Sequence, residues 1–262
     1  MSVVIIQDEI VHYEVLGRGK PLLFLHGWVG SWRYWIPVMQ VSSVSFRSYA
    51  IDLWGFGDSS KNPSYYSLGE QTALIGHFME RMGMDKIALI GHGLGACVAL
   101  NFAAQFPSLV DRVMAVSLPH GQSTINPRLS SSGPTELAEW LLRKEALADA
   151  ARTEAAKSDQ RAIQASFDML EDLNLRELSE RSTIPSLFVH GQTDPAVLPP
   201  GFDELLGFPE HTHHTLFEES GHFPMLDEST KFNRLLSDFL TLPSGTTPRQ
   251  LQVKDEWKRR VR

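Results

Sequence analysis

The sequence predicts an α/β fold, in which a central, mostly parallel sheet of about eight strands carries helices on both faces. Three observations predict it. Short apolar runs of strand length alternate with longer amphipathic segments along most of the chain. Glycine-containing segments follow several of these runs, where turns from strand to helix are expected. Finally, 262 residues, of which 42 % are hydrophobic, are enough for one large buried core.

Eight apolar runs are expected to form the sheet. The first two lie close together in sequence and are expected to pair as an antiparallel hairpin. Most of the others are apolar almost throughout, as strands covered on both faces are. In chain order the expected strands are Val3–Ile6, Val11–Leu16, Pro21–Leu25, Ser48–Leu53, Lys86–Ile90, Arg112–Ser117, Ser186–His190 and Thr212–Phe217. The expected helices between them are Ser67–Met82, Leu94–Phe106 and Pro224–Leu240.

Residues 118–182 break this alternation. Prolines and glycines interrupt the beginning of the segment, and two helical stretches follow, near Thr135–Lys157 and Asp159–Leu173. Leu137 and Trp140 recur at helical spacing, which is typical either of a helix facing the core or of a lid over a pocket. Because the segment is inserted between two expected strands, we interpret it as a lid.

The chain is therefore divided into three parts. Residues 1–117 and 183–241 are expected to form the α/β core, with residues 118–182 inserted as a helical lid. Residues 242–262 form a tail that ends in a basic segment. We expect this tail to be solvated or loosely docked, with a partner or membrane-surface segment as the alternative.

Charge and cysteine content limit the partners and the compartment. A formal net charge of -7 does not favour a nucleic-acid partner, because such partners select for clustered Lys and Arg. Cys97 is the only cysteine, so no internal disulfide can form, and a reducing, cytoplasmic location is expected. No basic segment precedes the first apolar run, so a signal peptide is not expected. Three glycines, His92 and Asn101 interrupt the longest apolar stretch, Ile87–Ala104, which we interpret as strand, turn and helix rather than a membrane span.

Four motifs occur in a fixed order at the ends of expected strands. Each is weakly specific alone, but their order and their positions after strands make them specific together. They are Leu25–Gly30, Asp52–Ser59, Gly91–Gly95 and, as one pair, His190–Pro195 with Glu219–Phe223. Over about residues 10–240, this arrangement resembles the α/β-hydrolase family.

The resemblance implies a role for three positions. In that family, Gly91–Gly95 corresponds to the nucleophile elbow G-x-S-x-G, a sharp turn from strand to helix with a strained central residue. The centre here is Gly93, so the attacking oxygen is missing while the backbone conformation remains accessible. Asp194 is implied to be the carboxylate that orients His222, and His222 to be the general base.

The resemblance also implies an oxyanion hole and a pocket. The two donors are the backbone N–H groups of Trp28 and Leu94, the latter at a helix N-terminus that favours negative charge. We expect a mainly apolar pocket between lid and strand ends, with His26 and Trp140 among its residues. His26 and Asp52 are expected to support loops rather than to perform chemistry. The expected partner is a small-molecule substrate, with no cofactor and no metal.

The missing nucleophile defines the functional hypothesis. The motifs are most similar to small carboxylesterases, lactonases and carbon–carbon bond hydrolases, whose nucleophile is serine. We therefore expect a protein that acts on a small to medium carbonyl compound, with ordinary hydrolysis disabled by Gly93. A water in the volume left by the hydroxymethyl group would give slow turnover, and Gly93→Ser would raise it by several orders of magnitude.

Other hypotheses stay open. The chain could be a non-catalytic binding protein, or Asp194 and His222 could activate water or abstract a substrate proton as in a lyase or a cofactor-free oxygenase. A dinucleotide-binding protein is a third class, since Gly91, Gly93 and Ala96 fit G-x-G-x-x-A, but the next expected strand lacks the acid at its end. Cys97 is expected to be a core residue, and the histidines of the segment 211–214 to lie at an exposed strand end.

Overall fold

A single sheet forms the centre of the molecule. The computed structural model describes the chain except residues 1, 145, 169, 171–182, 244–245 and 252–262. Its eight strands lie in the order β1-β2-β4-β3-β5-β6-β7-β8. They are β1 Ser2–Ile6, β2 Glu9–Gly17, β3 Lys20–Leu25, β4 Phe46–Ile51, β5 Ile87–His92, β6 Val110–Val116, β7 Ser186–Gly191 and β8 Thr212–Phe217. β2 pairs antiparallel with β1 and with β4, and the other neighbours are parallel. The predicted fold class is confirmed.

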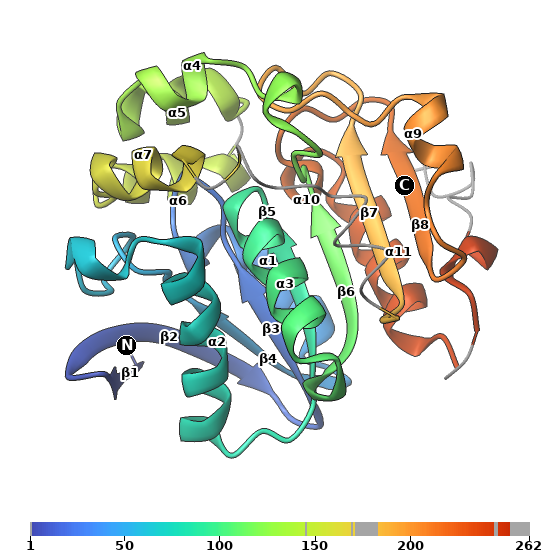
Figure 1. Ribbon diagram of the computed structural model, residues 1–262, viewed down its shortest axis with the longest axis horizontal. Helices are drawn as coiled ribbons and strands as arrows, with labels where there is room; N and C mark the ends of the chain where they lie inside the picture. Colours follow the sequence, from blue (N-terminus) through green and yellow to red (C-terminus); the bar gives the residue numbers. More distant parts are fainter. Residues whose placement is uncertain (1, 145, 169, 171–182, 244–245, 252–262) are drawn as a thin grey trace.

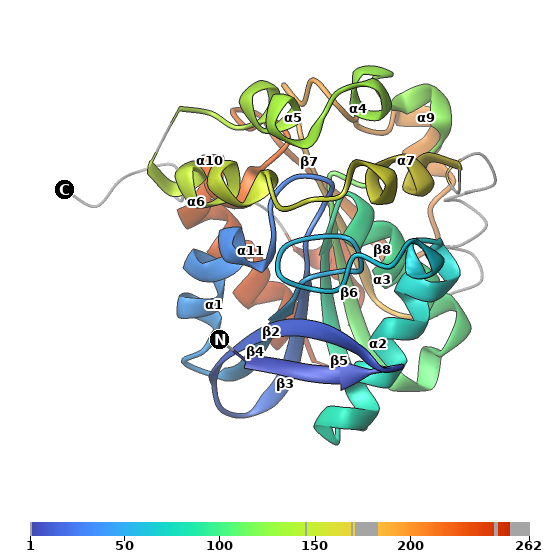
Figure 2. The ribbon, with the colours of Figure 1, turned by 90° about the vertical axis from the view of Figure 1, so that its left-hand side faces the viewer.

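Helices cover both faces of this sheet (Figures 1 and 2). α2 (Leu68–Met82) and α3 (Leu94–Gln105) lie on one face, and α1 (Ile36–Ser42) and α11 (Ser229–Thr241) lie on the other. Ser67 caps the N-terminus of α2, because its side chain accepts a hydrogen bond from the backbone N–H of Glu70 in the first turn. None of the helices in the described ranges is long and apolar enough to span a membrane.

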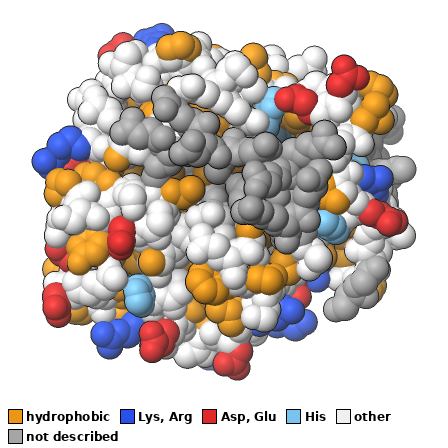
Figure 3. All heavy atoms as spheres, in the orientation of Figure 1, with side chains coloured by type: hydrophobic (Ala, Val, Ile, Leu, Met, Phe, Trp, Pro, Cys, Tyr) orange, Lys and Arg blue, Asp and Glu red, His pale blue; other side chains and the backbone are white. Residues whose placement is uncertain are grey.

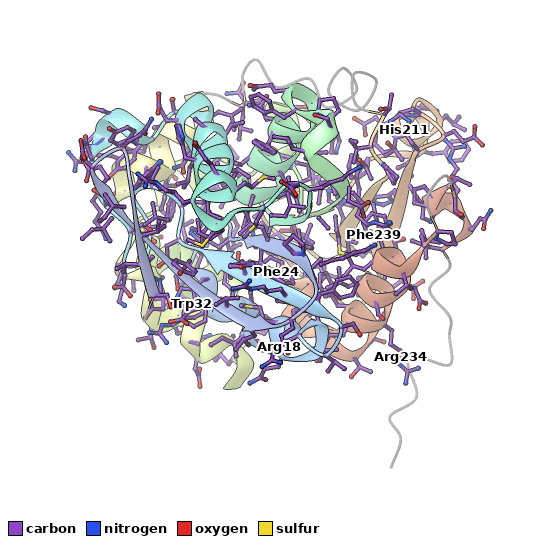
Figure 4. All side chains as sticks on the ribbon, turned by 90° about the horizontal axis from the view of Figure 1, so that it is seen from below. Arg18, Phe24, Trp32, His211, Arg234 and Phe239 are labelled. Atoms are coloured by element: carbon purple, nitrogen blue, oxygen red, sulfur yellow. The ribbon has the colours of Figure 1, made fainter. Side chains whose placement is uncertain are left out.

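The buried core is centred on the parallel strands. Every residue of β5 is buried, and Phe24 of β3 lies fully buried in the middle of the molecule (Figure 4). Arg18 and Arg234 are exposed at its rim. On the face seen in Figure 3, basic and acidic side chains are scattered among one another rather than gathered in a patch of one sign. Burial of whole strands is what a central parallel sheet requires, because helices cover both of its faces.

The register of the parallel strands brings their carboxyl ends to one edge. Leu25 at the end of β3 pairs with Gly91 of β5. Val116 at the end of β6 pairs with His92 of β5 on one side and with Val189 of β7 on the other. The segments that follow these strands therefore start side by side, and all four sequence motifs come to this edge.

Helices of the inserted segment lie across the same edge (Figures 1 and 2). They are α4 Arg128–Ser131, α5 Pro134–Leu141, α6 Ala146–Ala155 and α7 Gln160–Asp168. The prediction of one continuous helix over 135–157 is wrong: α5 ends where Leu142 adopts extended backbone, at φ -92° and ψ 129°. Arg152 of α6 donates to the carbonyl oxygens of Leu142 and Arg143, which stabilises the break. Residues 171–173 of the second expected helix lie outside the described residues.

The C-terminal part also differs from expectation. The helix expected over 224–240 is divided into α10 (Pro224–Asp227) and α11, because Glu228 between them leaves helical geometry and accepts a hydrogen bond from Ser220 Oγ at 2.6 Å. The described beginning of the tail is docked, which is one of the two states expected for it. Arg249 donates to the Phe208 carbonyl at 2.9 Å, beside the edge strand β8. Residues 252–262, which include the basic segment, lie outside the described residues.

The close approach of α3 to the end of β3 gives a first test. A Cβ added at Gly95 would lie 2.5 Å from the Leu25 carbonyl oxygen, so we expect Gly95→Ala to lower the free energy of unfolding by at least about 2 kcal/mol. Gly76→Ala in α2 is the matched control. Its Cβ would meet Phe102 at an ordinary 3.6 Å, so helix propensity should stabilise the protein by about 0.5–1 kcal/mol. Equal effects of the two variants in urea titrations would contradict this packing.

Candidate active site

The turn between β5 and α3 has a backbone conformation that few residues adopt. Gly93 connects the two elements with φ 52° and ψ -114°. Its N–H donates to the Val116 carbonyl at 2.9 Å, and its carbonyl accepts from Ala96 at 3.1 Å. Side chains are strained at this φ, so the turn has the geometry that the sequence predicts for a nucleophile elbow. The residue at its centre carries no side chain.

Asp194 and His222 come from different loops and form a buried hydrogen-bonded pair. Oδ2 of Asp194, after β7, lies 2.8 Å from Nδ1 of His222, after β8. Oδ1 of Asp194 accepts from the N–H groups of Ala196 and Val197 at 2.8 and 3.1 Å. Burial alone would raise the pKa of Asp194, but the facing imidazole and these N–H groups hold it below its ordinary value. An ionised Asp194 fixes the proton of His222 on Nδ1 and leaves Nε2 free to act as a base.

A buried network fixes the backbone of His222 relative to the elbow. His92, directly before Gly93, donates from Nε2 to the His222 carbonyl at 2.8 Å, and Ser117 Oγ donates to the same oxygen at 2.9 Å. Tyr34 donates to Nδ1 of His92 at 2.9 Å. Burial and the nearby His222 lower the pKa of His92 well below its ordinary value, so His92 is neutral.

The same network reaches the loop after β3. The Tyr34 hydroxyl accepts from the N–H of Gly27 at 2.6 Å. One chain of hydrogen bonds therefore connects Gly27, Tyr34, His92 and the His222 carbonyl. The sequence gives no signal for the roles of Tyr34 and Ser117, because neither belongs to a motif. The positive φ of Ser117, 47° at the end of β6, is a property that only the structure reveals.

The side chain of Trp28 lies directly at the centre of the elbow. A Cβ built on Gly93 would be 2.9 Å from Cζ3 and 3.0 Å from Cε3 of the indole. The ring is fully buried and lies nearly parallel to the imidazole of His222, with centroids 6.2 Å apart. The indole therefore crowds the Cβ position, where the expected water of a missing hydroxymethyl group would lie.

The two expected oxyanion donors lie on either side of the elbow. Leu94 is the first residue of α3, and Trp28 follows Gly27, whose Cα is 3.5 Å from the Cβ position of Gly93. Among the described residues, neither the N–H of Trp28 nor that of Leu94 has a hydrogen-bond acceptor. Buried N–H groups without a protein partner at a helix N-terminus are suited to a carbonyl oxygen or an anion.

The two expected pocket residues, His26 and Trp140, each have contacts within the protein. His26 is fully buried, donates from Nδ1 to the Gly27 carbonyl at 2.8 Å and accepts at Nε2 from the N–H of Leu53 at 3.0 Å. Nδ1 therefore bonds within its own loop and Nε2 connects this loop to the one after β4, in line with the expected supporting role of His26. Trp140 of α5 is half-buried, with the guanidinium of Arg128 4.8 Å from its ring centroid.

Asp52 also connects loops. It accepts hydrogen bonds from His12 Nδ1 and from the N–H groups of Trp32 and Asp58, at 2.9–3.0 Å. His12, Asp52 and Asp58 are the one group of metal-ligating side chains that converges within the described part of the chain. Asp58 of this group pairs with Lys157 at 3.0 Å.

The histidines after residue 210 are not at an exposed strand end. His214 is half-buried, and its Nε2 lies 3.2 Å from Nδ1 of the buried His190. Burial lowers the pKa of His190 to about 4 and that of His214 to about 3. Both rings are therefore neutral near pH 7, and their separation is that of a hydrogen bond rather than of two ligands around a metal.

The site combines a strand–turn–helix elbow, a carboxylate–histidine pair and two free N–H groups. This combination is the arrangement found in hydrolases. The model of the alpha/beta hydrolase fold family matches residues 20–145. Pimeloyl-[acyl-carrier protein] methyl ester esterase from Vibrio parahaemolyticus is 24% identical over 253 residues, which cover 87% of this chain and 97% of that protein. A soluble epoxide hydrolase from Corynebacterium is 34% identical over 111 residues, but the chain spans only 39% of its length.

Solved structures agree with the fold. The enol-lactonase from Burkholderia xenovorans superposes with a TM-score of 0.79 at 17% identity, over 92% of this chain and all of that one. The chain has the α/β-hydrolase fold, and residues 20–145 match the model of that family. The relatives found in these comparisons include esterases, lactonases and epoxide hydrolases, so the family is one of hydrolases.

The hydroxyl of Tyr34 is expected to be essential for the buried network. Tyr34→Phe leaves the N–H of Gly27 and Nδ1 of His92 without partners, so the free energy of unfolding should fall by about 1–3 kcal/mol. Tyr65→Phe is the matched control, because its hydroxyl bonds no described residue, and a change below about 0.5 kcal/mol is expected. Urea unfolding of both variants measures the difference, and equal losses would refute the network.

The lowered pKa of Asp194 predicts a pH dependence. A carboxyl group whose pKa is lower in the folded than in the unfolded state stabilises the fold above its unfolded pKa of about 3.9. This contribution is lost as the pH falls through the folded-state pKa. Asp194→Asn should therefore have a lower free energy of unfolding than the parent at pH 7. The difference between the two proteins should become smaller below pH 4. Asp203→Asn, at an exposed position of α9 (Phe202–Leu206), should show no gap at either pH.

Proposed function

We propose that this chain binds a small to medium carbonyl compound of the ester or lactone class without forming a covalent acyl intermediate. The observation that carries the proposal is Gly93, which stands at the centre of an elbow whose base, acid and backbone donors are present. Ordinary ester hydrolysis is disabled because no attacking oxygen is attached at this position. In this proposal residues 1–117 and 183–241 form the core, and residues 118–182 act as its lid.

The free backbone donors support a carbonyl ligand. Trp28 and Leu94 each carry a buried N–H without an acceptor among the described residues. A carbonyl oxygen bound between them would satisfy both, aided by the N-terminus of α3. Nε2 of His222, the ring nitrogen that does not face Asp194, can accept a hydrogen bond from a hydroxyl or amide group of the same ligand.

The comparisons support the same class of ligand. The esterase from Vibrio parahaemolyticus aligns over nearly its whole length, which favours esters. A serine-to-glycine variant of an N-acyl homoserine lactonase, with a TM-score of 0.78 and 20% identity, was solved in complex with N-hexanoyl homoserine lactone. Replacement of a serine by glycine is thus compatible with ligand binding in this fold.

Other chemistries have less support from the geometry. Cys97 does not replace the nucleophile, because it is buried in α3 and burial raises the pKa of its thiol to about 12. Direct activation of water by His222 would require a water near Gly93, where the indole of Trp28 lies. Dinucleotide binding would require an acid at the end of β6, and that position holds Ser117.

An ester assay tests the proposal. With 4-nitrophenyl acetate, we expect turnover no higher than the roughly 10³–10⁴-fold over water that an oxyanion site gives without its triad. Intact-mass spectra after incubation should show no acyl adduct, and calorimetry with N-hexanoyl homoserine lactone should show saturable binding. His222→Ala is the control and should change turnover by less than about tenfold, since no nucleophile depends on the base. Fast turnover that His222→Ala abolishes would establish nucleophile-free catalysis instead.

A further inference from the structure

The indole of Trp28 stands where the side chain of a nucleophile would be. Two of its ring carbons lie 2.9 and 3.0 Å from the Cβ position of residue 93, a separation that non-bonded carbons do not sustain. Every residue other than glycine at position 93 would place its Cβ there. With the ring where it lies, a Cβ at position 93 does not fit, so either the indole or the turn would have to shift.

Three contacts hold the ring in this position. Its Nε1 donates to Oγ of Ser166 in α7 at 2.7 Å. The ring of Phe167, also in α7, stacks on the indole with centroids 5.5 Å apart and planes inclined by 16°. The imidazole of His222 lies nearly parallel to the indole, with centroids 6.2 Å apart and planes inclined by 22°. A ring packed against two other rings and hydrogen-bonded at its edge cannot turn aside without losing these contacts.

We propose that Trp28 is the residue that determines what this site can hold, because its indole has taken the place of the nucleophile side chain. This rests on the proposed function in so far as the site binds a carbonyl ligand. Such a ligand meets an apolar ring at position 93 instead of a hydroxyl group, which favours apolar acyl groups over polar ones. It follows that serine at position 93 alone does not restore a hydrolase, and that a second change at position 28 is required.

A stability cycle tests the steric part of the proposal without any ligand. Gly93→Ala should lower Tm by about 6–10 °C in the parent, since it adds backbone strain and a clash with the indole. Trp28→Leu removes the ring carbons that contact position 93. In the Trp28→Leu background, Gly93→Ala should lower Tm by less than about half as much as in the parent, because the backbone strain alone remains. Trp28→Met provides a second background if the first reduces the yield of folded protein.

Gly83→Ala is the matched control for this cycle. Gly83 ends α2 with φ 64°, and a Cβ there would meet nothing within 4 Å. The variant therefore carries the backbone strain without the clash, and its Tm shift should be the same in the parent and in Trp28→Leu. An equal shift of Gly93→Ala in both backgrounds would overturn the proposal.

An activity cycle tests the consequence for chemistry. On 4-nitrophenyl acetate, Gly93→Ser should remain close to the parent, and Gly93→Ser with Trp28→Leu should exceed it by roughly 10²-fold or more. Gly93→Ala with Trp28→Leu controls for the enlarged site and should stay low. If Gly93→Ser alone is as fast as the double variant, Trp28 is no obstacle and the proposal is wrong. Gly93→Ala could lower Tm less in Trp28→Leu than in the parent while the double variant with serine gains no turnover. That result would support the placement of Trp28 and overturn the hydrolase-derived function of the site.

Discussion

The turn at Gly93 is the constraint on which the site depends. Strand β5 must change direction there within one residue and enter α3, and the helix start must lie against the end of β3. The N–H of Gly95 donates to the His26 carbonyl at 3.1 Å, and no space is left for a Cβ between these segments. The same close approach places the loop of Trp28 beside the elbow. Fold stability and site geometry therefore rest on one piece of tight backbone packing.

Neutral histidines extend this constraint to the rest of the site. His26 connects two loops and His92 connects the elbow to the backbone of His222, each with both ring nitrogens bonded. Burial lowers the pKa of both rings, so neither carries a charge that would need a buried partner. Such fully satisfied polar networks specify one arrangement, because each alternative leaves a donor or acceptor unpaired. The backbone of His222 is therefore fixed, while its ring is held separately by Asp194.

Sequence reasoning predicts the parts of this structure that depend on local pattern. The strands follow from apolar runs, and the elbow, Asp194 and His222 follow from motifs at strand ends. The break between α5 and α6 could not be predicted, because the side chain of Arg152, ten residues after Leu142, stabilises it. The position of the Trp28 ring depends on Ser166, which is 138 residues away in sequence. A side-chain conformation set by such a distant contact leaves no signal in the local pattern.

The volume of the elbow explains why glycine is stable at its centre. A glycine there relieves backbone strain at φ 52°, but an empty space the size of a hydroxymethyl group inside a packed site would cost about 1 kcal/mol. Trp28 removes that cost by filling the space with its ring, and the hydrogen bond to Ser166 anchors the ring to α7. A serine at position 93 would bring back both the strain and the clash. Gly93 and Trp28 therefore form a stable packing arrangement. A nucleophilic side chain introduced at position 93 would have to disrupt this packing before it could interact with His222.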